Sequence, residues 1–460
     1  GAGRLEPFDF QSRYNRSFFQ AVKDVPKDTK SYWNSTCQHG FYRALVQSVA
    51  PKLLYSWHRK ITSEMVLNVH EDAKDVIQAG AVWAVKHETT PDFINVLPAL
   101  AAMNEGKPAL KGIMKTLDMK KEPALWLLSQ PVRPFSYQVK RPRLKNVSDP
   151  KRVREAKQYN ADIVASARRH LQDSNRPTQV LIFPEGTTYT DGSVSYLHNG
   201  VFEVSRDGAP VVPVGLNYDL IAGEKRPDSK YKYRVFMNVG KPFYYKPEKK
   251  QARGWALVKD RIMHFVKKMP QEREVFREYL SDRIVNLQTI TAGGLIGYEL
   301  IKLKEQGSRS VNKSDISRIV RAKAKALEGL SPIDPALLKT GEAEGLIERA
   351  WKNLCDMGYL SPEGKGDVAT LNWQALDRDT SSPNTTVDPK VVLLKRVHEA
   401  RTSKRKSMNI TLVDLIVATK RKTKILESTI GKDKVDADLQ TNAAVIRKVG
   451  IAWKEMCQDG

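Results

Sequence analysis

The chain has 460 residues, which is long enough for two domains or for one domain with an extension. Hydrophobic residues make up 41% and charged residues 28%, a balance that argues against a disordered chain or one with many membrane spans. Lys and Arg number 76 against 52 Asp and Glu, so the formal net charge is +24. This surplus favours an anionic membrane surface, a nucleic acid or phosphorylated substrates as partners, with a solubilising surface as the alternative.

The cysteine content and the hydropathy indicate the kind of compartment in which the protein is expected. The cysteines Cys37, Cys355 and Cys457 are far apart and odd in number, so neither a disulfide framework nor a CxxC metal site is expected. A reducing compartment is favoured. No apolar run approaches the roughly 18 residues of a spanning helix, and the first residues carry no secretory signal pattern.

Residues 1–62 are expected to form an N-terminal segment whose second half is helical. From residue 38 apolar side chains recur on one side, and Pro51 is expected to kink or divide the helix. An apolar stripe with basic neighbours can lie on an anionic membrane, but a core-packing helix has the same pattern, and both interpretations stay open. The apolar stripe is Phe41, Leu45, Val49, Leu53 and Leu54, and the basic neighbours are Lys52, His58, Arg59 and Lys60.

Residues 63–268 alternate between strand and helix patterns. Such alternation predicts an α/β domain with a mixed, largely parallel sheet flanked by helices. In sheets of this kind, ligands bind at the carboxyl ends of the strands. We expect strands at 65–69, 81–85, 179–183, 211–217 and 234–239, and helices at 72–79, 92–103 and 151–172.

Residues 269–460 are expected to form a mostly helical, basic C-terminal extension. Glycines predict helix breaks at residues 292–294 and at Gly307, and residues 375–390 form a polar, turn-rich linker. A helix, a short apolar segment and a Pro-Glu-Gly-Lys-Gly turn make the region around 343–374 winged-helix-like. Basic clusters follow at 404–406 and 420–422.

His87 and Asp92 stand five positions apart. On one continuous helix that spacing turns through about 140°, and the side chains would diverge. Thr90 suits an N-cap, Pro91 the first helical position and Asp92 the first turn, so His87 is expected in the loop before the helix. A tight turn can then bring the carboxylate to one ring nitrogen, leaving the other to take a proton from a substrate hydroxyl. A His and an Asp at this spacing are otherwise more often structural.

An apolar strand ending at Phe183 leads directly into Pro184, Glu185, Gly186 and Thr187. Pro184 cannot continue a central strand, and Gly186 permits close approach of the backbone. Glu185 is therefore presented at a strand's carboxyl end, where it could bind substrate hydroxyls or organise the site. A loop-bracing salt bridge is the alternative.

Two further segments carry less information alone. Lys140 and Arg141, followed by Arg143 and Lys145, could bind phosphate, or could be a solvated basic face. Residues 211–218, Val-Val-Pro-Val-Gly-Leu-Asn-Tyr, predict a buried strand with a proline at its edge.

Taken in order, the H-x4-D of residues 87–92, the V-x-R of 139–141, the F-P-E-G-T of 183–187 and the V-P-V-G-L-N of 212–217 resemble the four motif blocks of the glycerolipid acyltransferases. This is the superfamily of glycerol-3-phosphate and 1-acylglycerol-3-phosphate O-acyltransferases. The resemblance covers roughly residues 60–245 and implies the acyltransferase fold.

The resemblance also implies roles. His87 would be the general base and Asp92 its orienting partner. The substrate-binding set would be Lys140, Arg141, Pro184, Glu185, Gly186 and Thr187, with Arg141 on phosphate. The donor would be acyl-CoA or acyl-carrier protein, and the acceptor glycerol 3-phosphate or lysophosphatidate, in phospholipid biosynthesis. No metal or organic cofactor is expected. The protein would work on an anionic membrane surface, as a peripheral protein on the cytoplasmic side.

Two positions depart from the family pattern. Lys86 stands where the family usually has Asn, and Thr188 where it often has Arg or Ser. Lys86 or the cluster at 140–145 is the candidate replacement for a missing phosphate contact, and a different acceptor is the alternative. The alternatives of another class are a basic nucleic-acid- or membrane-binding protein on an acyltransferase scaffold and an inactive relative. Nucleic acid is not the expected partner.

Overall fold

The computed structural model describes about half of the chain. The described residues are 5–9, 55, 58–88, 92–103, 109–115, 136–139, 150–173, 177–186, 194, 197–225, 232–245, 272–329, 332–364 and 367–372. Most of the expected helical stretch at 38–62, the linker at 375–390 and the basic clusters near 404 and 420 lie outside these residues.

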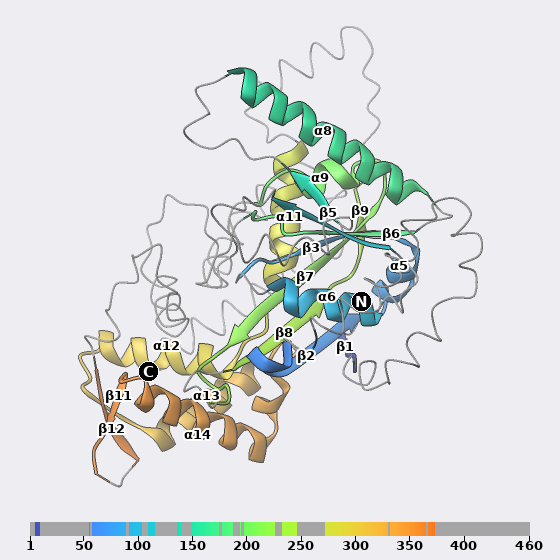
Figure 1. Cartoon of the computed structure of the whole chain (residues 1–460). Helices are drawn as coiled ribbons and strands as arrows, with labels where there is room; N and C mark the ends of the chain where they lie inside the picture. Colours follow the sequence, from blue (N-terminus) through green and yellow to red (C-terminus); the bar gives the residue numbers. More distant parts are fainter. Residues whose placement is uncertain are drawn as a thin grey trace, which may run out of the picture.

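A nine-stranded sheet forms the centre of the described structure (Figure 1). Its order is β1-β2-β8-β7-β3-β6-β4-β5, with β9 paired to β7. The pairings β2–β8, β7–β3, β3–β6, β6–β4 and β4–β5 are parallel, while β1–β2, β8–β7 and β7–β9 are antiparallel. The strands are β1 (Leu5–Pro7), β2 (Thr62–His70), β3 (Ala81–Val85), β4 (Ala109–Lys115), β5 (Ser136–Val139), β6 (Thr178–Ile182), β7 (Pro210–Asp219), β8 (Tyr233–Val239) and β9 (Phe243–Tyr244).

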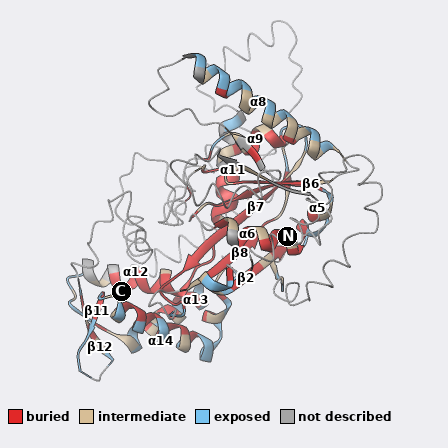
Figure 2. Cartoon of the chain, in the orientation of Figure 1, coloured by how far each residue is buried: buried red, intermediate tan, exposed pale blue. Residues whose placement is uncertain are grey.

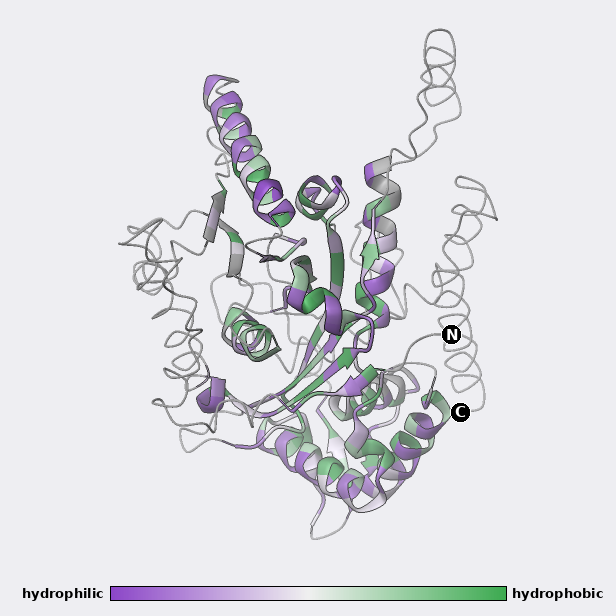
Figure 3. Ribbon diagram, turned by 90° about the vertical axis from the view of Figure 1, so that its right-hand side faces the viewer, coloured by the Kyte–Doolittle hydropathy of each residue, from purple (hydrophilic) through white to green (hydrophobic). Residues whose placement is uncertain are grey.

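Helices cover both faces of this sheet. Helices α5 (Ala73–Ala79) and α6 (Asp92–Met103) pack on one face, with a core that includes Trp83, Val96 and Leu100. Helices α8 (Pro150–Gln172), α9 (Gly200–Ser205) and α11 (Glu272–Asn286) lie on the other face. In Figure 3, α8 projects at the upper left with hydrophilic and hydrophobic residues in alternation, as an amphipathic helix requires.

The expected mixed, largely parallel α/β fold is confirmed. Every strand and helix expected between residues 65 and 239 is present, and the bounds of β3 and α6 agree fully. The sequence patterns missed β1, β4, β5, β9 and α9, which are short or irregular segments with weak periodicity.

The described part of the C-terminal extension, residues 272–372, is mostly helical, as expected. After α11 come α12 (Ala292–Glu305), β10 (Ser310–Asn312), α13 (Lys313–Leu327), a 3-10 helix (Pro335–Leu338), α14 (Thr340–Asp356), β11 (Leu360–Pro362) and β12 (Val368–Leu371). The last three strands form a sheet of order β10-β12-β11. We call the described residues of 287–372 the C-terminal module. Its element order is consistent with the winged-helix interpretation, which stays a prediction together with the domain boundaries.

The expected break at residues 292–294 is wrong, because α12 begins there. Asp219 of β7 accepts a hydrogen bond from the Gly293 N–H at 2.8 Å, and Thr291 Oγ1 accepts from the Gly294 N–H at 3.1 Å. A Cβ on Gly293 would lie 2.3 Å from Asp219 Oδ1. The glycine therefore lets a helix start close against the sheet, and does not interrupt one.

The module packs on the sheet face that α9 and α11 also cover. One apolar core runs from Val82 in the sheet to Leu371 at the end of the module. Figure 2 shows β7 and β8 buried along nearly their whole length between the two parts. The module thus shares its core with the α/β unit.

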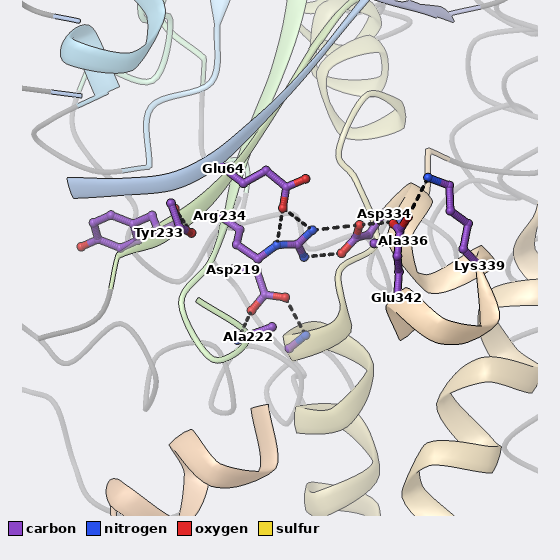
Figure 4. Close-up of polar contacts among 11 residues, drawn as sticks. Glu64, Asp219, Ala222, Tyr233, Arg234, Asp334, Ala336, Lys339 and Glu342 are labelled. Atoms are coloured by element: carbon purple, nitrogen blue, oxygen red, sulfur yellow. Dashed lines mark hydrogen bonds and ion pairs between the residues drawn. The ribbon is translucent and has the colours of Figure 1, made fainter. Parts of the chain in front are cut away.

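A buried ion pair crosses the same contact (Figure 4). Arg234 of β8 binds both carboxylate oxygens of Asp334, and its Nε also donates to Glu64 of β2 at 2.9 Å. Side-chain exposure is 3% for Arg234 and 0% for Asp334. Burial alone would lower the pKa of Arg234, but the hydrogen bond and charge of Asp334 raise it, helped by Asp219 and Glu64.

Removing one partner of this pair should destabilise the fold strongly. Arg234→Met leaves Asp334 buried without its cation, so we expect a loss of about 3–5 kcal/mol in the free energy of unfolding. The double variant Arg234→Met/Asp334→Leu should recover part of that loss, because the carboxylate that Arg234 paired with is then removed as well, while Asp219 stays buried. Denaturant unfolding measures both. Lys339→Met, which removes the exposed ion pair to Glu342, is the matched control and should cost at most about 1 kcal/mol. A loss that small for Arg234→Met would contradict the account.

Candidate functional site

The site is built where three parallel strand ends meet. Strand β3 lies between β6 and β7 and is parallel to both, with Ala84 opposite Ile182 and Val85 opposite Val214. The loop after β3, which holds His87, therefore lies beside the turn after β6, which holds Glu185.

His87 and Asp92 are hydrogen bonded, as expected from the helix-start signals between them. His87 Nδ1 lies 2.9 Å from Asp92 Oδ2. Asp92 is the first residue of α6 and has 0% side-chain exposure, whereas the His87 side chain is 20% exposed. Thr90 and Pro91, expected to start the helix, lie outside the described residues.

Three donors converge on the Asp92 carboxylate. The Glu88 N–H donates to Oδ2 at 2.6 Å, and the Tyr218 hydroxyl donates to Oδ1 at 2.5 Å. A carboxyl group surrounded by donors accepts as a carboxylate, so the His87 contact places the proton on Nδ1. The Nε2 atom then carries the lone pair that can accept a proton.

Phe183 packs against one face of the His87 imidazole ring. Its ring stacks on His87 with a centroid distance of 4.4 Å and an interplanar angle of 29°. Within the described part of the chain, no serine, threonine or cysteine is hydrogen bonded to the His87 ring.

Glu185 is tied to the backbone beside the histidine. Its Oε2 accepts from the His87 N–H at 2.6 Å, and the residue is 1% exposed. The turn that presents it closes with the Gly186 N–H donating to Phe183 O at 3.0 Å, and Gly186 has a φ of 66°. The buried carbonyl of Pro184 accepts from the His198 N–H at 2.7 Å. This geometry favours the organising role of Glu185 over direct substrate binding.

Lys86 does not face a substrate. Its side chain has 0% exposure, and its Nζ pairs with Glu88 Oε2 at 2.7 Å. The idea that Lys86 replaces a missing phosphate contact is therefore not supported by its position. Lys140, Arg141, Thr187 and Thr188 lie outside the described residues.

The patterns missed a chain of polar residues behind Asp92. Tyr218 accepts from Asn95 Nδ2 at 2.9 Å, and Asn95 Oδ1 lies 2.8 Å from His58 Nδ1 and 3.3 Å from the Thr62 hydroxyl. Tyr218 was detectable in part, because it continues the buried face of Val212, Val214 and Leu216 but ends in a hydroxyl. Nothing local to Asn95 or His58 indicates this contact.

The described residues contain no group of three or more His, Cys, Asp or Glu that could hold a metal ion. Among the helices described, none is both long enough and apolar enough to cross a membrane. The arrangement can orient one imidazole, keep its Nδ1 protonated and present Nε2 as a base.

Comparison with known proteins gives a distant structural likeness. No protein-family model matches the chain, and no curated protein matches it. Among solved structures, it is similar to the 1-acyl-sn-glycerophosphate (LPA) acyltransferase PlsC from Thermotoga maritima, with a TM-score of 0.30 and 15% identity over 56% of this chain and 97% of that chain.

His58 predicts a pH dependence of stability. Burial lowers the pKa of His58 below 6.5, and the hydrogen bond to Asn95 only partly opposes this. Below about pH 6.5 the unfolded chain binds a proton that the folded chain does not, so stability falls as pH drops and levels off below the folded pKa. Thermal melts at several pH values should show less of this fall in His58→Gln than in the wild type. The exposed His198→Gln is the control, and an equal change in both variants would contradict the assignment to His58.

Proposed function

We propose that the chain is an O-acyltransferase that moves a fatty-acyl group from a thioester onto the hydroxyl of glycerol 3-phosphate, with lysophosphatidate as the alternative acceptor. The observation that carries the proposal is the partly exposed His87 ring, held by the buried Asp92 with its Nε2 directed away from that contact. The ordered resemblance of the four motif blocks supplies the reaction class.

In this mechanism His87 Nε2 takes the proton of the acceptor hydroxyl as its oxygen attacks the thioester carbonyl. The tetrahedral intermediate collapses, the C–S bond breaks, and the thiolate leaves with the proton from the imidazolium. The products are an ester and a free thiol. Asp92 stabilises the imidazolium between the two proton transfers. Acyl-CoA or acyl-carrier protein is the donor, and no cofactor takes part.

The surplus of basic residues supports the proposed substrates and the proposed membrane association. A net charge of +24 favours association with phosphorylated substrates and an anionic membrane surface. We therefore propose a peripheral protein on the cytoplasmic side. Lys140, Arg141 and Thr187 remain the proposed contacts to the phosphate and glycerol of the acceptor.

The exposed face of α14 disfavours the nucleic-acid alternative. If the module acted as a DNA-binding winged helix, α14 would be the helix that enters the groove, and basic residues would face the phosphates. Its exposed charged residues are instead mostly acidic: Glu342, Glu344, Glu348 and Asp356, against Arg349 and Lys352. Each of these carboxylates pairs with a nearby cation, namely Lys339, Arg321, Lys313 and Lys225, so the exposed charges of the helix itself give phosphates no basic surplus.

The reaction can be tested directly. Purified full-length protein on anionic liposomes, given labelled palmitoyl-CoA and either glycerol 3-phosphate or lysophosphatidate, should form one labelled ester. His87→Ala should lower its rate by about 10²–10⁴-fold, the usual contribution of a general base. Liposome binding should persist in the variant. No product with either acceptor, across several chain lengths and both CoA and carrier-protein donors, would contradict the proposal.

Glu185 variants separate its two roles. Glu185→Gln keeps an oxygen that can accept from the His87 N–H, whereas Glu185→Ala does not. An organising residue therefore predicts that Gln retains much more activity than Ala, with KM for the acceptor little changed in Gln. A large rise in acceptor KM for Gln would show instead that the carboxylate binds substrate.

A further inference from the structure

Successive side chains of β7 point to opposite faces of the sheet. Tyr218 lies on the face of α6 and donates to Asp92. Its neighbours Asn217 and Asp219 point to the opposite face and bind the C-terminal module. Three consecutive residues thus touch both the His–Asp pair and a segment about 70 residues later in the chain.

Asn217 holds the segment that begins the module. Its Nδ2 donates to Thr289 O at 2.5 Å, and its Oδ1 accepts from the Thr289 N–H at 3.0 Å. Asn238 of β8 adds a bond to Thr289 Oγ1 at 2.8 Å and one to Leu287 O at 2.6 Å. A Cβ on Gly215 would lie 2.4 Å from Leu287 O, so the segment lies directly on β7.

Asp219 makes the second attachment. Its two oxygens accept from Gly293 at the start of α12 and from Ala222 in the turn after β7 (Figure 4). The residue is fully buried. A negative charge at the first turn of a helix is stabilising. Burial raises the pKa of Asp219, and Arg234 and the two N–H groups partly oppose the rise.

Tyr218 is fixed on the other face by packing and hydrogen bonds. It is 5% exposed, and its ring meets Tyr233 of β8 edge to face at 5.2 Å. Strand β7 continues beyond the last residue of β3, which pairs with Val214. Position 218 therefore projects past β3, and the end of β7 is held there by its pairing with β8 and by the module bonds of Asn217 and Asp219.

We propose that the C-terminal module is a positioning element for the His87–Asp92 pair, acting through Asn217 and Asp219 on Tyr218. Tyr218 is then a positioning residue of the proposed acyl transfer and not a catalytic one. The inference rests on the proposed function for its kinetic test, but its structural test is independent of any activity.

The kinetic test separates kcat from KM. Tyr218→Phe removes one hydrogen bond to a charged group, so kcat should fall about 10- to 100-fold while KM for donor and acceptor changes by less than about 3-fold. Asn217→Ala should lower kcat in the same way. In the Tyr218→Phe background it should add less than about 3-fold, because both changes act on one contact.

Asn353→Ala is the matched control. Asn353 of α14 also joins the module to the α/β unit, through Ile221 O and Gly223 O, but it touches neither β7 nor the site. It should leave kcat near the wild-type value at temperatures well below its melting point. Equal losses of kcat in Asn353→Ala and Asn217→Ala would overturn the inference, because the module would then matter only for general stability.

Hydrogen exchange provides the structural test. The amides of His87 and Glu88 donate to Glu185 and Asp92, so a peptide containing them reports on the site. In the full-length protein, Asn217→Ala and Tyr218→Phe should speed exchange there, and Asn353→Ala should not. Unchanged exchange in Asn217→Ala would overturn the coupling. Wild-type protein without acyltransferase activity would instead overturn the proposed function, and the exchange result would still decide this inference.

Discussion

A carboxylate taken out of water must be surrounded by hydrogen-bond donors, and Asp92 imposes that requirement on the whole site. Its donors come from the loop after β3 and, through Tyr218, from the far end of β7. Neither strand can shift without leaving a buried charge short of a partner. The sheet register and the chemistry of His87 therefore depend on one another.

The same strand end carries a second constraint. Asn217 and Asp219 satisfy backbone groups of the segment that enters α12, and Gly215 leaves room for that segment. A module that folded independently of the sheet would not need the buried hydrogen bonds of Asn217 and Asp219 inside a shared apolar core. The buried Arg234–Asp334 pair fixes the contact further along β8. The site and the C-terminal module thus share β7 as a structural element.

Local rules predicted a large part of this structure. The Thr-Pro-Asp signal put Asp92 at a helix start and His87 in the loop before it, and Pro184 and Gly186 marked the turn after β6. Glu185 could not be assigned to the His87 N–H, because that contact depends on the register between β3 and β6. The Gly293 prediction failed because the cap of α12 comes from Asp219, 74 residues earlier. Tyr218, Asn95 and His58 meet only in three dimensions.

The central claim is that the acceptor hydroxyl, activated by His87, attacks the thioester directly. The most direct test is rapid mixing of the protein with acyl-CoA, followed by intact-mass analysis and measurement of released thiol. We predict no acyl-protein adduct, no burst of thiol without acceptor, and one ester formed per thiol once acceptor is added. An acylated protein that forms at the turnover rate and transfers its acyl group to the acceptor would contradict it, because the chain would then supply the nucleophile itself.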